Sequence, residues 1–482
     1  MTVLSVPRRI NQTWHLCNKV FLQPYLRIFC TSVLSNNPTL NFENHRDVFK
    51  FKSSWEIFRA LMVLRICSVN VFVDNSLRIM RQASSLMGTR GLSMVLKPTF
   101  YGQFVGGDSE EELRHTAHKL TSAGLRLMVC PVQEEDAGEA DQLNEEKYDR
   151  NLAYIMETGS IMARTGTEIP NLQFKVTAFM PADLVVKLSV LLSRGTYSME
   201  ALVSRLSAAM NVGYETDTRK EVNDITSCVT EGQINDLSAQ ETSQLRRGLI
   251  RVKTLGVMAR KLGLNLLVDA EYTYMNPGIS AVALTMMQEF NTTSAIVSNT
   301  YQCYLKDAYE SIQKDKSLIL TRKGHFGAKI VRGAYMEKER KMAKEQGRPS
   351  PVCQSYEDTN TKYDQVIAHM IEYISQDPAG YLVVASHNET SVSRASEMIT
   401  QKGLKTTGSV VFGQIYGMGE QISMPLANSG HIVYKSVPYG PLLEVLPYLS
   451  RRAAENRVVL SGARKERALL SAELRRRMNI LD

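Results

Sequence analysis

Two adjacent arginines end a stretch with the pattern of a strand, a turn and a helix, residues 431–457. Apolar residues recur at helical spacing over 442–449, and Arg451, Arg452 and Glu455 follow on the same predicted helix. Guanidinium groups near the packed side of an apolar helix need an anionic partner that offsets their desolvation. A ligand carboxylate is the simplest such partner, and a solvated arginine pair on the helix surface is the alternative.

Polar side chains also stand at the ends of short apolar runs, where a buried strand gains nothing from them unless they are paired or bound to a ligand. They are Lys175, Thr177, Asp269, Glu271, Asn299, Gln302, Lys329, Arg332, Tyr335, Ser386, His387, Asn388, Gln414 and Ser436. This mixed-charge set indicates a site for an anionic ligand, and Gly333 and Ala334 after Arg332 would let backbone approach a phosphate. A structural ion pair between Asp269 and Lys329 is the competing explanation for those two residues.

Eight apolar or β-branched runs must position these side chains. They cover 126–132, 172–180, 264–273, 294–302, 327–335, 381–388, 409–417 and 431–437. Apolar strands that alternate with helices predict a parallel sheet covered on both faces, and eight units favour a closed (β/α)8 barrel of the TIM type over an open doubly wound sheet. In such barrels the active site lies at the carboxyl ends of the strands, where these polar residues occur.

The chain is predicted to have four regions. Residues 1–42 contain four basic residues and no acidic one, which indicates a mitochondrial transit peptide, with a disordered basic arm as the alternative. Residues 43–122 have helical patterns and predict an arm that precedes the barrel. The barrel is assigned to 123–460, with a helical insertion at 181–263 after the second strand, and a basic helix or tail follows at 461–482.

Composition excludes several classes of protein. The chain has 482 residues and a net charge of +8, but the basic excess lies at its two ends, which disfavours a nucleic-acid partner. Seven cysteines without a CxxC motif predict neither a disulfide framework nor a metal site. The sequence has no uninterrupted apolar run of about 18 residues, so it predicts no transmembrane helix. Since GxGxxG and P-loop motifs are also missing, a nucleotide cofactor would be bound by the barrel itself.

Six motifs resemble those of the proline dehydrogenase family of flavoenzymes, in the family's order. They are VDAEYT, NTYQCYLKD, AKIVRGAY, VASHNE, VFGQIYGMG and YLSRRAAEN, and the resemblance covers about residues 55–477. It implies non-covalently bound FAD on a (β/α)8 barrel and oxidation of a cyclic amino acid at the ring carbon next to nitrogen, with hydride transfer to flavin N5. It also implies ubiquinone as electron acceptor and contact with the matrix side of the inner mitochondrial membrane.

The same resemblance implies roles for individual residues. The implied catalytic residues are Asp269 and Lys329. The implied substrate-binding residues are Lys175, Tyr335, Ser436, Arg451, Arg452 and Glu455, with the two arginines as a carboxylate clamp. The implied FAD-binding residues are Ala270, Asn299, Arg332, Gly333, Ala334, Ser386, His387 and Gln414. Many members carry Gln in place of Asn299 and Arg in place of Lys329, and both replacements keep a hydrogen-bond donor.

Ser436 bears on the substrate, because proline-specific members carry a tyrosine there that closes the pocket. A serine leaves room for a ring hydroxyl and can bond it, which favours the hydroxyproline dehydrogenase branch and oxidation of trans-4-hydroxy-L-proline to 1-pyrroline-3-hydroxy-5-carboxylate. L-proline is the alternative substrate. Two further hypotheses are a Schiff-base lyase or aldolase that uses Lys175 or Lys329, and a non-enzymatic, membrane-associated binding protein that uses the basic tail.

Overall fold

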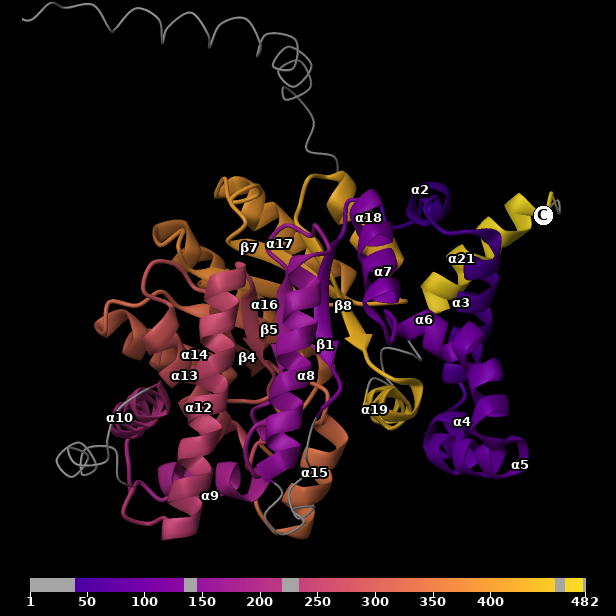
Figure 1. Cartoon of the computed structure of the whole chain (residues 1–482). Helices are drawn as coiled ribbons and strands as arrows, with labels where there is room; N and C mark the ends of the chain where they lie inside the picture. The colour runs from indigo at the N-terminus through magenta and orange to yellow at the C-terminus, as the bar shows by residue number, and fades with distance from the viewer. Residues whose placement is uncertain (1–39, 134–144, 219–233, 456–463, 480–482) are drawn as a thin grey trace, which may run out of the picture. The chain divides into compact units, whose positions relative to one another are not determined.

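The computed structural model of the chain describes residues 40–133, 145–218, 234–455 and 464–479 (Figure 1). The predicted transit segment, 1–42, therefore lies outside the described residues except for its last three positions.

Eight parallel strands form a closed barrel in chain order, which confirms the predicted (β/α)8 fold. They are β1 (Arg126–Pro131), β2 (Asn171–Phe174), β3 (Asn265–Val268), β4 (Val297–Gln302), β5 (Gly327–Val331), β6 (Tyr381–Ala385), β7 (Val410–Ile415) and β8 (Val433–Tyr439). The barrel closes where β1 pairs with β8, from Arg126 opposite Tyr434 to Pro131 opposite Tyr439. The strands read as apolar runs because both of their faces are buried, as in other parallel sheets.

Helices surround the barrel and supply its outer layer (Figure 1). They are α8 (Glu145–Ala163), α9 (Ala182–Ser193), α10 (Met199–Thr218), α12 (Ala239–Leu262), α13 (Asn276–Phe290), α14 (Ala308–Thr321), α15 (Met336–Glu345), α16 (Tyr356–Gln376), α17 (Glu389–Gln401), α18 (Glu420–Asn428) and α19 (Leu442–Glu455). The insertion between β2 and β3 contains α9, α10 and α12. Ser238 and Glu241 form a reciprocal capping box that starts α12.

The segment before β1 is an arm of helices. Its elements are α2 (His45–Phe49), α3 (Ser54–Cys67), α4 (Asn70–Asp74), α5 (Ser76–Leu96), the π-helical turn η1 (Lys97–Tyr101), α6 (Gly102–Phe104) and α7 (Glu110–Ser122). A buried ion-pair chain joins the arm to the barrel, because Glu420 lies 2.8 Å from Lys52 and 2.9 Å from Lys435. Burial opposes ionisation of Glu420, but the two ammonium groups outweigh it and lower the carboxyl pKa to about 2.

The basic C-terminal helix α21 (Arg464–Arg477) packs against α2 and α3 of the arm. Leu470 is buried in one apolar cluster with Phe49 and Ile57. Arg477 donates to the backbone carbonyl of Phe49 at 2.9 Å and to Glu473 at 2.7 Å. Part of the positive charge expected to be available in the tail therefore holds the arm in place, which weakens the hypothesis of a tail that docks on lipid.

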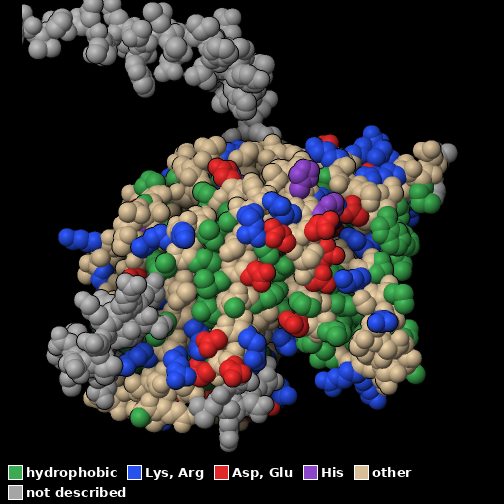
Figure 2. Space-filling model, in the orientation of Figure 1, with side chains coloured by type: hydrophobic (Ala, Val, Ile, Leu, Met, Phe, Trp, Pro, Cys, Tyr) green, Lys and Arg blue, Asp and Glu red, His purple; other side chains and the backbone are tan. Residues whose placement is uncertain are grey.

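The arm exposes many large apolar side chains on or next to α3, α4 and α5, and apolar side chains are visible over α3 and α4 in Figure 2. They are Trp55, Phe58, Met62, Val69, Val71, Phe72, Ile79, Leu86, Met87, Met94 and Val95. A concentration of this kind marks an interaction surface more often than scattered exposed residues do. Within the described ranges, none of the helices combines the length and apolar character that crossing a bilayer requires.

Candidate active site

A cavity of about 260 Å³ lies at the carboxyl ends of the barrel strands, and we call it the barrel cavity. Most of the site residues predicted from the sequence line it: Lys175, Asp269, Ala270, Lys329, Arg332, Gly333, Ala334, Tyr335, Ser386, His387, Gln414, Ser436 and Arg452. They come from β2, β3, β5, β6, β7 and β8, the loops after these strands, and α19. The topology thus brings together residues that are far apart in the chain, as expected for a (β/α)8 barrel.

Asn299, which was predicted to bind FAD, is not among the residues that line the barrel cavity. Its side chain points away from the barrel cavity and donates to the hydroxyl of Ser280 on α13 at 2.9 Å. Side chains alternate along a strand, so its neighbour Thr300 and then Gln302 face the cavity instead. Both of them line it. The polar pattern of the strand was visible in the sequence, but the face that each residue takes depends on the register.

The arginine pair is divided by the geometry of α19. Arg452 lines the barrel cavity, whereas Arg451 is not among its lining residues. Consecutive residues on an α-helix point about 100° apart, so two neighbours rarely face one pocket equally. Glu455 ends α19, but its side chain lies outside what the structure describes. Its support of an arginine, and the part that Arg451 plays in a clamp, remain predictions.

Aromatic rings fix the guanidinium of Arg452. Its central carbon lies 5.2 Å from the ring centroid of Tyr448 and 5.7 Å from that of Tyr335. Its two terminal nitrogens lie 3.4 and 3.5 Å from the hydroxyl oxygen of Tyr335. Both rings are buried, so these cation–π contacts limit the orientations of the guanidinium fork. A guanidinium fork held in this way can donate two hydrogen bonds to a planar anion such as a carboxylate.

Lys329 lies at the centre of a hydrogen-bonded chain that crosses the barrel. Its ammonium group donates to Asp269 at 2.5 Å and to Gln173 at 2.8 Å, and the amide of Gln173 donates to the Ser436 hydroxyl at 2.7 Å. Sequence reasoning missed Gln173. It stands two positions before Lys175, so the alternation of strand side chains placed it on the same face and could have identified it.

Lys175 and Glu271 form a second buried pair of opposite charges beside this chain. Their charged atoms are 3.8 Å apart, and Thr177 donates to Glu271 at 3.0 Å. A Schiff-base lysine needs an amino group that is free to attack a carbonyl carbon, not one already engaged by a carboxylate. Because Lys175 and Lys329 both have carboxylate partners, the arrangement disfavours the lyase hypothesis.

Arg332 is held entirely by neutral groups among the described residues. It donates to Ser386 at 2.6 Å, to Ser391 at 2.8 Å and to Asn360 at 2.9 Å. Its guanidinium also lies over the ring of Tyr363, 4.3 Å from the centroid. Among the residues that the structure describes, Arg332 makes no ion pair with a carboxylate. Its positive charge is therefore available to an anionic ligand in the barrel cavity, such as a phosphate.

His387 lies at the wall of the cavity in its neutral form. Burial and the nearby Lys435 charge lower the pKa of His387 to about 3. Its Nε2 atom accepts a hydrogen bond from the backbone of Ile415 at 3.1 Å, which leaves Nδ1–H as the donor. Gln414 is oriented by Ser423, whose hydroxyl donates to the Gln414 carbonyl at 3.0 Å.

Gly333 follows Arg332 at a point where backbone and ring approach closely. Its φ is +120°, and a Cβ atom there would lie 1.6 Å from the Tyr304 ring. We therefore expect Gly333→Ala to lower the free energy of unfolding by about 2–4 kcal/mol, because it adds overpacking to backbone strain.

Gly347→Ala is the matched control, because Gly347 also has a positive φ (+61°) but no atom within 4 Å of the added Cβ. Denaturant unfolding of both variants separates the clash from the strain. Equal losses in the two variants would contradict the clash.

Comparison with known proteins identifies the family. A family profile described as "Proline dehydrogenase" matches residues 113–465, which include all eight strands and the barrel cavity. The chain belongs to the proline dehydrogenase family. It is therefore an oxidoreductase of the dehydrogenase type, as the resemblance implied, and neither a lyase nor a non-catalytic binding protein.

Individual relatives agree with this assignment. Hydroxyproline dehydrogenase of Xenopus laevis is 39% identical over 433 residues, which cover 89% of each chain. Proline dehydrogenase 1, mitochondrial, of Homo sapiens is 29% identical and is matched over 93% of this chain and 91% of its own. Among solved structures, proline utilization A from Bdellovibrio bacteriovorus aligns with a TM-score of 0.56 at 18% identity, over 85% of this chain and 38% of that one, and supports the fold alone.

Proposed function

We propose that the protein oxidises trans-4-hydroxy-L-proline to 1-pyrroline-3-hydroxy-5-carboxylate with FAD bound in the barrel cavity. The observation that carries the proposal is that one cavity is lined by both Arg452, suited to a carboxylate, and Ser436, suited to a ring hydroxyl. The relative named for hydroxyproline is 39% identical to the chain, whereas the relative named for proline is 29% identical. The higher identity to the relative named for hydroxyproline supports this choice of substrate.

The residues of the barrel cavity fit FAD. Arg332 offers a charge without a carboxylate partner among the described residues, and the buried hydroxyl of Thr300 has no hydrogen-bond partner there while its residue lines the cavity. We propose that Arg332, Gly333 and Ala334 would hold the phosphates and ribityl chain, and that Ser386, His387, Gln414 and Ala270 would hold the rest. Bound there, FAD would supply the hydride acceptor for the ring carbon next to nitrogen.

The chain itself would supply binding and orientation. Arg452 would hold the substrate carboxylate, and the walls of Tyr335 and Tyr448 would exclude water from the ring. Lys329 would keep a positive charge at the floor of the cavity; two of its three N–H groups are used by Asp269 and Gln173, which leaves one for a ligand. Asp269 would hold Lys329 in that position.

L-proline is the second candidate, and Ser436 separates the two substrates. Since Gln173 donates to the Ser436 oxygen, the hydroxyl proton of Ser436 is free to point toward a ligand hydroxyl. The unmodified protein is expected to have a higher kcat/KM for hydroxyproline than for proline. A site that bonds a hydroxyl can reject the analogue lacking it much more strongly than a roomy pocket can.

Ser436→Tyr is expected to reverse this preference, with the hydroxyproline-to-proline ratio of kcat/KM falling at least about tenfold. The phenol would fill the space needed by the ring hydroxyl. Initial rates with a soluble dye as acceptor measure the ratio. Ser436→Ala is the control that keeps the space but loses the bond, and we expect an intermediate ratio. A ratio unchanged by Ser436→Tyr would contradict the pocket assignment.

We further propose that the protein works on the matrix side of the inner mitochondrial membrane and passes electrons to ubiquinone. The composition of residues 1–42 supports import, and the human relative carries the word mitochondrial in its name. The exposed apolar face of the arm supports peripheral contact with the membrane.

A further inference from the structure

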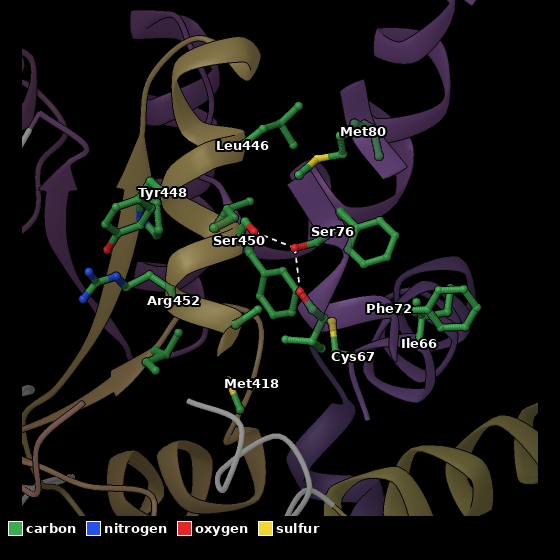
Figure 3. A pocket seen from close by; sticks show the side chains of 18 of the residues that line it. Ile66, Cys67, Phe72, Ser76, Met80, Met418, Leu446, Tyr448, Ser450 and Arg452 are labelled. Carbon is green, nitrogen blue, oxygen red and sulfur yellow. Dashed lines mark hydrogen bonds between the residues drawn. The ribbon is translucent and has the colours of Figure 1, made fainter. Parts of the chain in front are cut away.

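A second cavity, of about 310 Å³, lies between the helical arm and the barrel, and we call it the arm cavity. Apolar side chains from α3, α4, α5 and the β8–α19 region supply almost all of its wall (Figure 3). The two labelled serines in the wall, Ser76 and Ser450, satisfy each other, since their hydroxyls are 2.5 Å apart. Ser436 and Arg452 also line it, but they are shared with the barrel cavity, and the rest of the wall suits an apolar ligand.

The arm cavity adjoins the barrel cavity. Ile415, Ser436, Tyr448 and Arg452 line both of them. A ligand in the arm cavity would lie beside the proposed position of the substrate and FAD. This adjacency distinguishes the arm cavity from a packing defect remote from the chemistry.

The other end of the arm cavity reaches the surface of the arm. Phe72 and Ile79 line the cavity and are 50% and 41% exposed, so the opening lies between α4 and α5. Val71 and Leu86, on the same two helices, are 66% and 86% exposed. Apolar side chains thus continue from the exposed surface of the arm into the lining of the arm cavity.

We propose that the arm cavity binds the ring of a lipophilic quinone, which enters from a bilayer through the opening between α4 and α5. The inference rests on the proposed function. Oxidation of the imino acid removes two electrons and two protons as the C=N bond forms. A quinone takes up two electrons and two protons and leaves as the quinol, so the exchange balances. The hydrocarbon tail of the quinone would extend along the apolar surface of the arm.

Met80 provides the test, because its side chain lines the arm cavity while lying outside the barrel cavity. Met80→Trp should fill the arm cavity and raise the KM for a decyl-substituted quinone at least about tenfold. Reduction of a soluble dye by hydroxyproline should change less than about twofold, because the dye need not enter the arm cavity. Met94→Trp is the matched control on the same helix, since Met94 is 74% exposed and lines neither cavity.

A direct binding readout accompanies the kinetics. The holoenzyme is irradiated with a photoreactive azido-quinone, and the labelled peptides are identified by mass spectrometry. We expect label on residues of α4, α5 or α19 in the unmodified protein and in Met94→Trp, with at least about tenfold less in Met80→Trp. Label elsewhere, or a quinone KM unchanged by Met80→Trp, would overturn the inference, as would occupation of the cavity by another segment of this chain. If the unmodified protein did not reduce the dye with hydroxyproline or proline, the proposed function would be overturned instead.

Discussion

Replacing Arg452 with methionine is expected to lower kcat/KM for hydroxyproline by about 100-fold or more, mostly through a higher KM. Two charge-assisted hydrogen bonds to a carboxylate contribute about 1.5–3 kcal/mol each, and each 1.4 kcal/mol is a factor of ten. Methionine keeps the packing against the Tyr335 and Tyr448 rings, which the guanidinium now contacts. The change therefore removes the fork with little loss of shape, and steady-state kinetics with a soluble dye measure the result.

Two further variants make this prediction specific. Arg452→Lys keeps the charge but not the planar fork, so we expect it to recover only part of the loss. Arg451→Met removes the neighbouring arginine, which is outside the lining of the barrel cavity, and we expect a smaller effect. If Arg451→Met cost as much as Arg452→Met, the two arginines would act together as the clamp that their sequence suggested.

Replacing Lys329 with methionine is expected to lower kcat by about 100-fold or more. The ammonium group is the only link from Asp269 to Gln173 in the hydrogen-bonded chain that the described residues form across the barrel. Its loss removes a positioned donor from the site, an effect typically of 10²–10³ in rate, and leaves Asp269 without its partner. Single-turnover reduction with hydroxyproline under anaerobic conditions measures the change.

Lys253→Met is the matched control for Lys329→Met. Lys253 is also a buried lysine with a carboxylate partner, Glu289 at 3.4 Å, but it lies on α12 outside the barrel cavity. We expect this variant to alter stability and leave kcat within about twofold. Lys329→Arg, which keeps a charged donor, should recover much of the rate. Equal losses of kcat in Lys253→Met and Lys329→Met would mean that general destabilisation explains both.

The strands and most of the site could be predicted from the sequence, because both depend on local patterns. Apolar runs mark strands buried on both faces, and a lysine or aspartate at the end of such a run is too costly to be incidental. Asn299 shows where this reasoning stops. A shift of one position along β4 turns a side chain from the cavity to the helix layer, and nothing in the run VSNTYQ fixes that register alone.

Other features depend on contacts between distant segments and could not be predicted. The arm cavity combines residues such as Cys67 and Met80 with Leu446 and Tyr448, which lie more than 350 positions further along the chain. The sequence predicts a basic helix or tail at 461–482 but does not show what it packs against. In the structure, Leu470 is buried against the arm and Arg477 bonds to arm carbonyl groups.

The most direct test of the account is an anaerobic absorption spectrum of the purified protein before and after addition of trans-4-hydroxy-L-proline. We predict a flavin spectrum that bleaches on addition of the imino acid, with bleaching at low substrate concentration largely lost in Arg452→Met. A colourless protein that stays colourless after reconstitution with FAD, or bleaching that is unaffected by Arg452→Met, would contradict it.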